Sequence, residues 1–236
     1  MTATAADISM STRPRRFERT VKRGIDIVGA VVGLIVLSPV LAVAAMGILA
    51  TQGRPILFRH DRPGLNETPF RIAKFRTMRA PRQGEVWFRT DAERVTRFGR
   101  LLRSTSIDEL PELWNVLRGD MSLVGPRPLL LEYLDRYTPG ERRRHEMRPG
   151  ITGWAAVNGR HATLFEDRLA LDTWYIDHWS LGLDLRILAR TVSQVLRRTD
   201  VSATQDLDEI EFPDRFESSL AEREDPLDGR VIDRPD

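Results

Sequence analysis

The chain has 236 residues, enough for one substantial domain, and it contains no cysteine, which excludes disulfides, a thiol nucleophile and a thiolate metal site. Its net charge of +2 hides an asymmetry, because residues 200–236 hold 13 acidic residues and 4 arginines, a net charge of −9, which leaves +11 for the rest. This basic body suits phosphate-bearing ligands or anionic lipid head groups, whereas a nucleic-acid partner is not expected because no recognised nucleic-acid-binding motif accompanies the charge.

An apolar segment near the N-terminus is predicted to enter a membrane. Residues 27–51 form a run of 25 residues without a charge, more than the ~18 that mark a membrane-helix candidate. Pro39 lies near the middle of this run, and proline removes a backbone donor and clashes with the preceding helical turn. We therefore expect the helix to break at Ser38 and Pro39, with the Ser38 hydroxyl bonded to a carbonyl that the break frees.

Basic residues flank the apolar segment on both sides. Five precede it and five follow it: Arg15, Arg16, Arg19, Lys22 and Arg23, then Arg54, Arg59, Arg62, Arg71 and Lys74. A crossing helix should show a basic bias to one side, so this pattern favours a re-entrant helix-break-helix, while a kinked single span stays open. The prediction is a basic segment at residues 1–16 and a re-entrant membrane helix at residues 17–52.

The rest of the chain is predicted to be mainly α-helical with a small β-hairpin. Runs at 55–58 and 70–77, separated by a turn at 62–66, indicate the hairpin. Helices are expected at 91–103, 110–117, 129–137 and 142–147, and an aromatic-rich stretch at 171–183 leads into an amphipathic helix. That helix suits either the membrane interface or ordinary core packing. Together these elements predict a compact cytoplasmic catalytic domain at residues 53–201, followed by an acidic, disordered tail at residues 202–236.

Two adjacent carboxylates, Asp108 and Glu109, lie where a helix is expected to begin. With Ser106 as the N-cap, Glu109 would fall at N3 and complete a capping box, a purely structural role. Pro111 blurs the start position of that helix. In chemical terms, an ionised carboxylate attacks phosphorus to give an acyl phosphate, and a neighbouring acid helps to bind a divalent cation. Both interpretations are open for this pair.

Basic residues in short distinctive motifs accompany the acidic pair, at Lys74, Arg76, Arg103, Arg127 and Arg160. Arg127 lies between two prolines, which restrict its backbone, and arginine presents a planar fork that matches phosphate oxygens. An exposed arginine in a proline-rich turn is the alternative. Arg160 follows an Asn-Gly pair that is first of all a turn signal. The four histidines show no metal-ligand spacing.

Several motifs together closely resemble the bacterial sugar transferase family, the monotopic phosphoglycosyl transferases. They are KFRTM at 74–78, TRFGR at 96–100, SIDELP at 106–111, WNVLRGDMSLVGPRP at 114–128 and RPGITGW at 148–154. The resemblance covers roughly residues 17–201 and fits the small form of the family. Ala156 departs from it, because the family often carries glutamine there.

The resemblance implies an enzyme that moves a sugar 1-phosphate from a UDP-sugar to undecaprenyl or another polyprenyl phosphate and releases UMP. Asp108 matches the nucleophile that forms a covalent phosphosugar intermediate, and Glu109 matches its acidic partner, with Mg²⁺ held at the pair. Lys74, Arg103, Arg127 and Arg160 match phosphate-binding positions, and Ser38-Pro39 matches the break in the re-entrant helix. Such an enzyme would lie on the cytoplasmic face of the bacterial inner membrane, in contact with phospholipid and with downstream glycosyltransferases as further partners.

Two other functions stay open at this point. A membrane-bound nucleotide-sugar diphosphatase would use the same carboxylates with water as the acceptor. A noncatalytic membrane scaffold for glycan enzymes would use only the basic face, and it gives no reason for Asp108, Arg127 and Arg160 to occur together.

Overall fold

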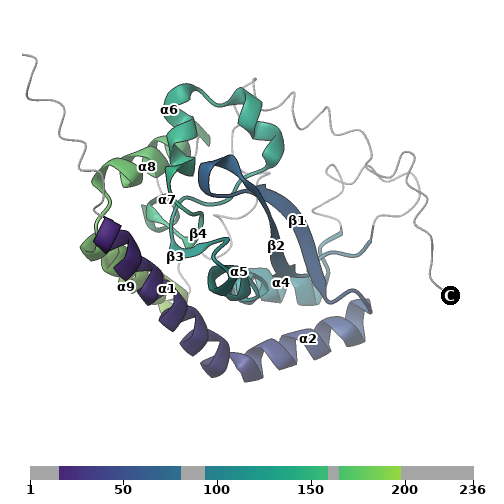
Figure 1. Cartoon of the computed structure of the whole chain (residues 1–236). Coiled ribbons are helices and arrows are strands. Elements are labelled where there is room, and N and C mark those ends of the chain that lie inside the picture. Colours follow the sequence, from purple (N-terminus) through teal and green to yellow (C-terminus); the bar gives the residue numbers. More distant parts are fainter. Residues whose placement is uncertain (1–15, 81–93, 159–164, 198–236) are drawn as a thin grey trace, which may run out of the picture.

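The computed structural model describes residues 16–80, 94–158 and 165–197. Its first two helices, α1 (Arg16–Val36) and α2 (Ser38–Gln52), meet at a bend of 62° (Figure 1). Pro39 has no N–H to donate to the Ile35 carbonyl four residues earlier, and the Ser38 hydroxyl donates to that carbonyl instead, at 2.8 Å. The predicted break and the predicted role of the Ser38 hydroxyl are both confirmed.

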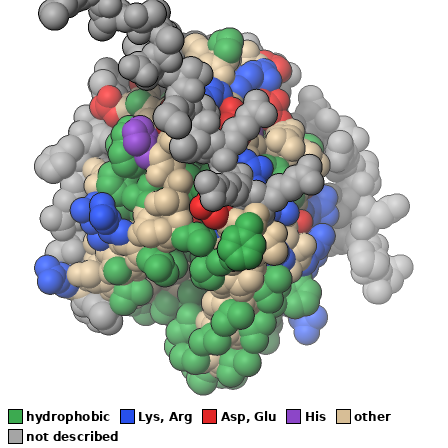
Figure 2. All heavy atoms as spheres, turned by 60° about the vertical axis from the view of Figure 1, so that its left-hand side comes forward, with side chains coloured by type: hydrophobic (Ala, Val, Ile, Leu, Met, Phe, Trp, Pro, Cys, Tyr) green, Lys and Arg blue, Asp and Glu red, His purple; other side chains and the backbone are tan. Residues whose placement is uncertain are grey.

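The bent pair exposes a large apolar surface. Side chains such as Val32, Ile35, Val43 and Met46 are more than half exposed, and Figure 2 shows hydrophobic side chains gathered at the lower end of the molecule, where Figure 1 places the bend. Within the described residues no single helix is long and apolar enough to cross a membrane, whereas the two helices satisfy that test jointly on length and composition.

The predicted hairpin is present, and Figure 1 shows it above α2. Strands β1 (Leu57–Pro63) and β2 (Pro69–Phe75) pair antiparallel, with a short 3-10 turn, η1 (Leu65–Glu67), between them. Asn66 in that turn has a positive φ of 52°, a conformation that asparagine tolerates better than most residues. The hairpin is confirmed, but its bounds differ: β1 begins two residues later than the predicted 55–58 and continues into the predicted turn, and β2 ends at Phe75 rather than at residue 77.

The central part of the domain carries α4 (Arg97–Ser104), η2 (Ile107–Glu109) and α5 (Glu112–Arg118). Helix α4 covers only part of the predicted 91–103, of which 91–93 lie outside the described residues. Helix α5 ends at Gly119 with φ 90°, as the glycine signal predicts.

A second small sheet was missed by the sequence prediction. Strands β3 (Ser122–Val124) and β4 (Gly150–Thr152) pair in parallel. The backbones approach so closely that a Cβ added to Gly150 would lie 2.1 Å from the Gly125 nitrogen. Only glycine fits at position 150.

The C-terminal part is helical, with corrections to the predicted bounds. The predicted helix at 129–137 is a 3-10 helix, η3 (Leu131–Arg136), and the one at 142–147 is mostly the 3-10 helix η4 (Arg143–Glu146), which follows α6 (Pro139–Arg142). The chain then forms α7 (Trp154–Asn158), α8 (Phe165–His178) and α9 (Leu181–Arg197). The predicted N-terminal segment 1–16 and acidic tail 202–236 lie outside the described residues, apart from Arg16.

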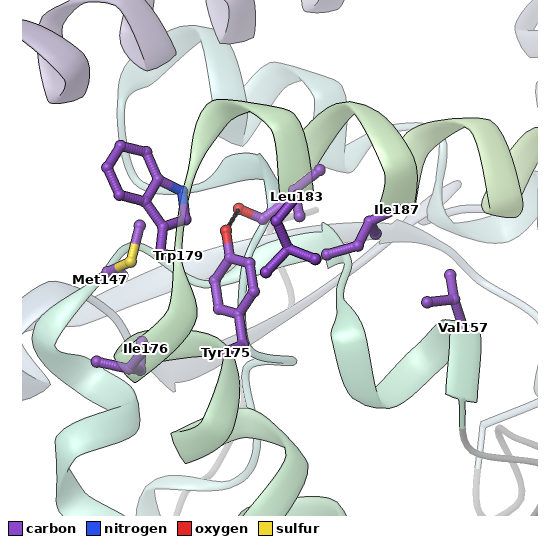
Figure 3. Packing of buried hydrophobic residues seen from close by; sticks show 8 residues of the cluster. Met147, Val157, Tyr175, Ile176, Trp179, Leu183 and Ile187 are labelled. Atoms are coloured by element: carbon purple, nitrogen blue, oxygen red, sulfur yellow. Dashed lines mark hydrogen bonds between the residues drawn. The ribbon is translucent and has the colours of Figure 1, made fainter.

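Core packing explains much of the aromatic-rich stretch before α9. Tyr175 and Trp179 are buried in a cluster with Met147, Leu183 and Ile187, and the dashed line in Figure 3 marks the hydrogen bond from the Tyr175 hydroxyl to the Val124 carbonyl, 3.4 Å. Helix α9 still presents an exposed apolar stripe of Leu185, Val192 and Val195 beside its arginines. The stretch before α9 therefore belongs largely to the core, while the helix itself has the predicted amphipathic character.

Helix α1 is tied to the rest of the domain by polar contacts that lie before its apolar half. Lys22 is buried and donates to Asp184 Oδ2 on α9 at 2.6 Å and to the Val124 carbonyl at 2.9 Å. Arg23 donates to the last carbonyls of α5, those of Val116 and Leu117, at 2.6 and 2.8 Å. The Arg23 guanidinium thus adds hydrogen bonds to carbonyls in the last turn of α5, where intrahelical partners run out.

Candidate active site

The acidic pair occupies η2, and the capping box predicted around it is absent. Ser106 has a left-handed backbone, with φ 53°, and its side chain makes no capping hydrogen bond. Pro111 stands directly before the first turn of α5, so this helix begins at Glu112, five residues later than a capping box at Ser106 requires. The structural interpretation of Glu109 as a helix cap is therefore wrong.

Glu109 instead binds two of the predicted cations. Lys74 Nζ, from the end of β2, donates to Glu109 Oε1 at 2.6 Å, and Arg127 donates to the same oxygen at 2.7 Å. Burial raises the pKa of Glu109, but Arg127 and Lys74 outweigh it and hold this pKa at about 2. Glu109 is thus an ionised carboxylate that fixes two cations beside Asp108.

Asp108 is buried but keeps a free oxygen. Its Oδ1 makes no hydrogen bond within the described part of the chain, although a buried carboxylate oxygen normally has a partner. Burial and the nearby charge of Glu109 raise the pKa of Asp108, while Lys74, Arg103 and Arg127 act in the opposite direction. Near these three cations, the lone pairs of Asp108 Oδ1 are not committed to any hydrogen-bond donor of the described residues.

Glu112 is a member of the site that sequence reasoning missed. Its Oε1 lies 3.1 Å from Lys74 Nζ, an ion pair without hydrogen-bond alignment. Burial raises the pKa of Glu112 to about 7, partly offset by Lys74 and reinforced by Glu109. A signal was present in the sequence, because Glu112 follows Asp108 by four residues in a run that is otherwise apolar.

The remaining predicted cations are placed differently. Arg103, in the last turn of α4, donates from Nε to the Thr77 hydroxyl at 3.1 Å and adds positive charge near Asp108. Arg76 does not join the acidic pair in the structure. Its guanidinium donates to carbonyls at the end of α2, those of Gln52, Gly53 and Arg54, which attaches this helix to the hairpin. Arg160 lies outside the described residues.

The side chains at the acidic pair offer few oxygen ligands for the predicted Mg²⁺. No group of three or more metal-ligating side chains occurs among residues 16–80, 94–158 and 165–197, and Glu109 Oε1 is already shared by two cations. The buried Oδ1 of Asp108, which has no hydrogen-bond donor among the described residues, nevertheless fits Mg²⁺, which proteins commonly hold through one or two carboxylates together with substrate phosphates. Mg²⁺ at the acidic pair stays a prediction.

The raised pKa of Glu112 predicts a pH-dependent stability. In the folded chain this pKa is about 7 rather than 4.5, so the folded protein binds the proton more tightly, and the free energy of unfolding falls as pH rises from 4.5 to 7. Between pH 5 and pH 8 the wild type should lose on the order of 2–3 kcal/mol more than E112Q, measured by denaturant unfolding in detergent. Equal losses in the two proteins would contradict the assignment, and E146Q, at an exposed glutamate, is the control.

Comparison with known proteins places this site in a family. The chain is 47% identical over 183 residues to the uncharacterized sugar transferase EpsL of Bacillus subtilis, covering 78% of this chain and 91% of that protein. It is 45% identical over 185 residues to a UDP-glucose:undecaprenyl-phosphate glucose-1-phosphate transferase of Caulobacter vibrioides, covering 74% and 69%. The Escherichia coli protein of the same name is 40% identical over 184 residues, which cover 74% of this chain and 40% of that protein. Residues 17–198 match the sequence pattern of the bacterial sugar transferase family, and the chain therefore belongs to this family.

Proposed function

We propose that this protein transfers a sugar 1-phosphate from a UDP-sugar to undecaprenyl phosphate and releases UMP. The names of the relatives from Caulobacter vibrioides and Escherichia coli support this donor and this acceptor. The observation that carries the proposal is the buried Oδ1 of Asp108, without a hydrogen bond and under the charges of Lys74, Arg103 and Arg127. A nucleophile for a diphosphate requires this combination, because the cations draw the anionic donor in and neutralise charge as it reacts.

In the first step, an Asp108 oxygen attacks the β-phosphorus of the donor. The bond from this phosphorus to the bridging oxygen breaks, UMP leaves with the electron pair, and the sugar phosphate is bound to Asp108 as an acyl phosphate. In the second step, an oxygen of the lipid phosphate attacks the same phosphorus, and the Asp108 carboxylate leaves. The products are the polyprenyl diphosphate sugar and the restored enzyme, so the kinetics should be ping-pong.

Lys74, Arg103 and Arg127 bind and orient the diphosphate in this scheme, and Glu109 holds two of them in place through its Oε1. Mg²⁺ held at Asp108 and Glu109 would neutralise diphosphate charge as a Lewis acid. Arg160 is proposed as a further phosphate-binding residue on the strength of its motif alone.

Mass spectrometry of the intact protein tests the reaction. The protein is incubated with Mg²⁺ and a panel of UDP-sugars, without acceptor. We expect one equivalent of UMP and a mass gain of one sugar phosphate at Asp108, with the accepted sugar identified by the added mass. Undecaprenyl phosphate should then discharge the adduct and start turnover. UMP release at full rate without the lipid would indicate a diphosphatase, and absence of both adduct and UMP with every donor would indicate a noncatalytic role.

The apolar bent pair is proposed to enter the cytoplasmic leaflet of the inner membrane and return, which places the basic site where the lipid phosphate lies. We expect cysteines introduced at Thr12 and Asn66 to be labelled in intact cells only after permeabilisation. In P39A the bend should relax. Residues 27–51 as one helix would be about 37 Å long, enough to cross ~30 Å of hydrocarbon, so one site should become accessible from outside. Outside labelling of one site in the wild type would contradict the re-entrant arrangement.

A further inference from the structure

Arg144 forms a buried ion pair with Asp172, next to the backbone of Arg127. The residue belongs to η4, is 2% exposed, and donates to Asp172 Oδ2 of α8 at 2.5 Å and to the Tyr137 hydroxyl at 3.0 Å. The same guanidinium donates to the backbone carbonyl of Arg127 at 2.7 Å. The buried pair therefore reaches the main chain of a residue whose side chain contacts Glu109.

The backbone around Arg127 has few hydrogen-bonding groups of its own. Pro126 and Pro128 have no N–H, so only Gly125 and Arg127 can donate from the backbone of residues 125–128. Gly125 donates to the Thr152 carbonyl at 2.9 Å, and the Pro126 carbonyl accepts from Gly150 at 3.0 Å. These bonds hold the segment before Arg127, whereas the bond from Arg144 holds the carbonyl of Arg127 itself.

We propose that Arg144, held by Asp172, is a positioning residue that fixes the main chain of Arg127 so that the Arg127 guanidinium meets Glu109 and the diphosphate of the donor. The inference rests on the proposed function. A planar guanidinium bonds Asp172, Tyr137 and the Arg127 carbonyl together, which the single ammonium of lysine does not reproduce with the same geometry. A displacement of about 1 Å at a charge-binding group is enough to reduce a rate about 10²-fold.

A neighbouring ion pair supplies a matched control. Arg143 donates to Asp177 at 2.5 Å and joins the same two elements, η4 and α8. The side chains of Arg143 and Asp177 are both about 40% exposed. Arg143 donates hydrogen bonds to Asp177 and Glu146 rather than to Arg127. Loss of Arg143 removes a contact between the elements without touching the Arg127 backbone.

The test measures UMP release and adduct formation with full-length protein, UDP-sugar and Mg²⁺. We expect the single-turnover rate of adduct formation to fall about 10²-fold in R127A and about 10-fold or more in R144Q, with a smaller loss in R144K and none in R143Q. Because Arg144 acts through Arg127, adding R144Q to R127A should cause little further loss. If Arg144 only stabilised the fold, R144Q would lower the melting temperature, and the activity losses of R127A and R144Q would multiply in the double variant.

Multiplying losses in R127A/R144Q, or full activity in folded R144K, would overturn the proposal. Should R144Q fail to fold, R144K and Y137F, which removes the hydroxyl that accepts from Arg144, carry the same double-variant comparison with R127A. The proposed function fails in a different way, because R127A would then retain wild-type activity or the wild type would form no adduct with any donor.

Discussion

Replacing Asp108 by asparagine is expected to abolish both the covalent adduct and the release of UMP, a loss of on the order of 10³-fold or more. Asparagine preserves the size of the side chain but removes the anionic oxygen that forms the bond to phosphorus. The variant should fold normally, because burial raises the pKa of Asp108 and the carboxylate therefore gains little from its surroundings. Intact-protein mass spectrometry and UMP release without acceptor measure the two effects.

The matched control for D108N is D167N, at an exposed aspartate in the first turn of α8. It makes the same chemical change away from the site and should react like the wild type. An adduct of undiminished rate in D108N would assign the nucleophile to another residue. Loss of the adduct together with loss of the folded state would call for the comparison to be repeated with D108S.

Replacing Asp184 by alanine is expected to lower the free energy of unfolding by about 3–5 kcal/mol. This carboxylate accepts from Lys22 at 2.6 Å, from the Tyr175 hydroxyl at 2.6 Å and from the Trp179 ring nitrogen at 3.1 Å. Without it the Lys22 ammonium is left buried, and among the described residues the Val124 carbonyl is its one remaining hydrogen-bond partner. Denaturant unfolding in detergent micelles, followed by tryptophan fluorescence and circular dichroism, measures the change.

The double variant K22M/D184L serves as the control for this prediction. It removes both charges and replaces them with apolar side chains, so it should recover the part of the loss that comes from the unpaired Lys22 charge. The Tyr175 hydroxyl and the Trp179 ring nitrogen still lack this acceptor, so the recovery should be partial. A loss below about 1 kcal/mol in D184A would show that water or a rearranged Lys22 compensates for the missing carboxylate.

Local features of the chain were predictable because their causes are local. Pro39 breaks its own helix whatever surrounds it, and Gly119 ends α5 through its own backbone freedom. The capping box failed for a related reason. Ser106 follows α4 so closely that its backbone turns left-handed, and Pro111 delays the next helix. A four-residue pattern does not contain that information.

Contacts between distant segments were predicted only in part. Lys74 and Arg127, which the motifs group with the acidic pair, both contact Glu109, although they lie 35 and 18 residues away in the sequence. Arg76 is only two residues from Lys74, but its guanidinium instead donates to the Gly53 carbonyl at the end of α2. Glu112 and the pair Arg144–Asp172 were missed, because a buried charge resembles any exposed charge until its partner is known.

The contacts of Arg23 with the end of α5 have a practical consequence for handling this protein. Helix α5 begins with Glu112 of the active site and ends on the carbonyls that Arg23 binds from α1. Truncation before the hairpin would therefore remove a support of the catalytic helix along with the apolar segment. Purification has to keep the N-terminal helices and shield their exposed side chains with detergent or lipid, since a shortened water-soluble fragment would lack part of its own scaffold.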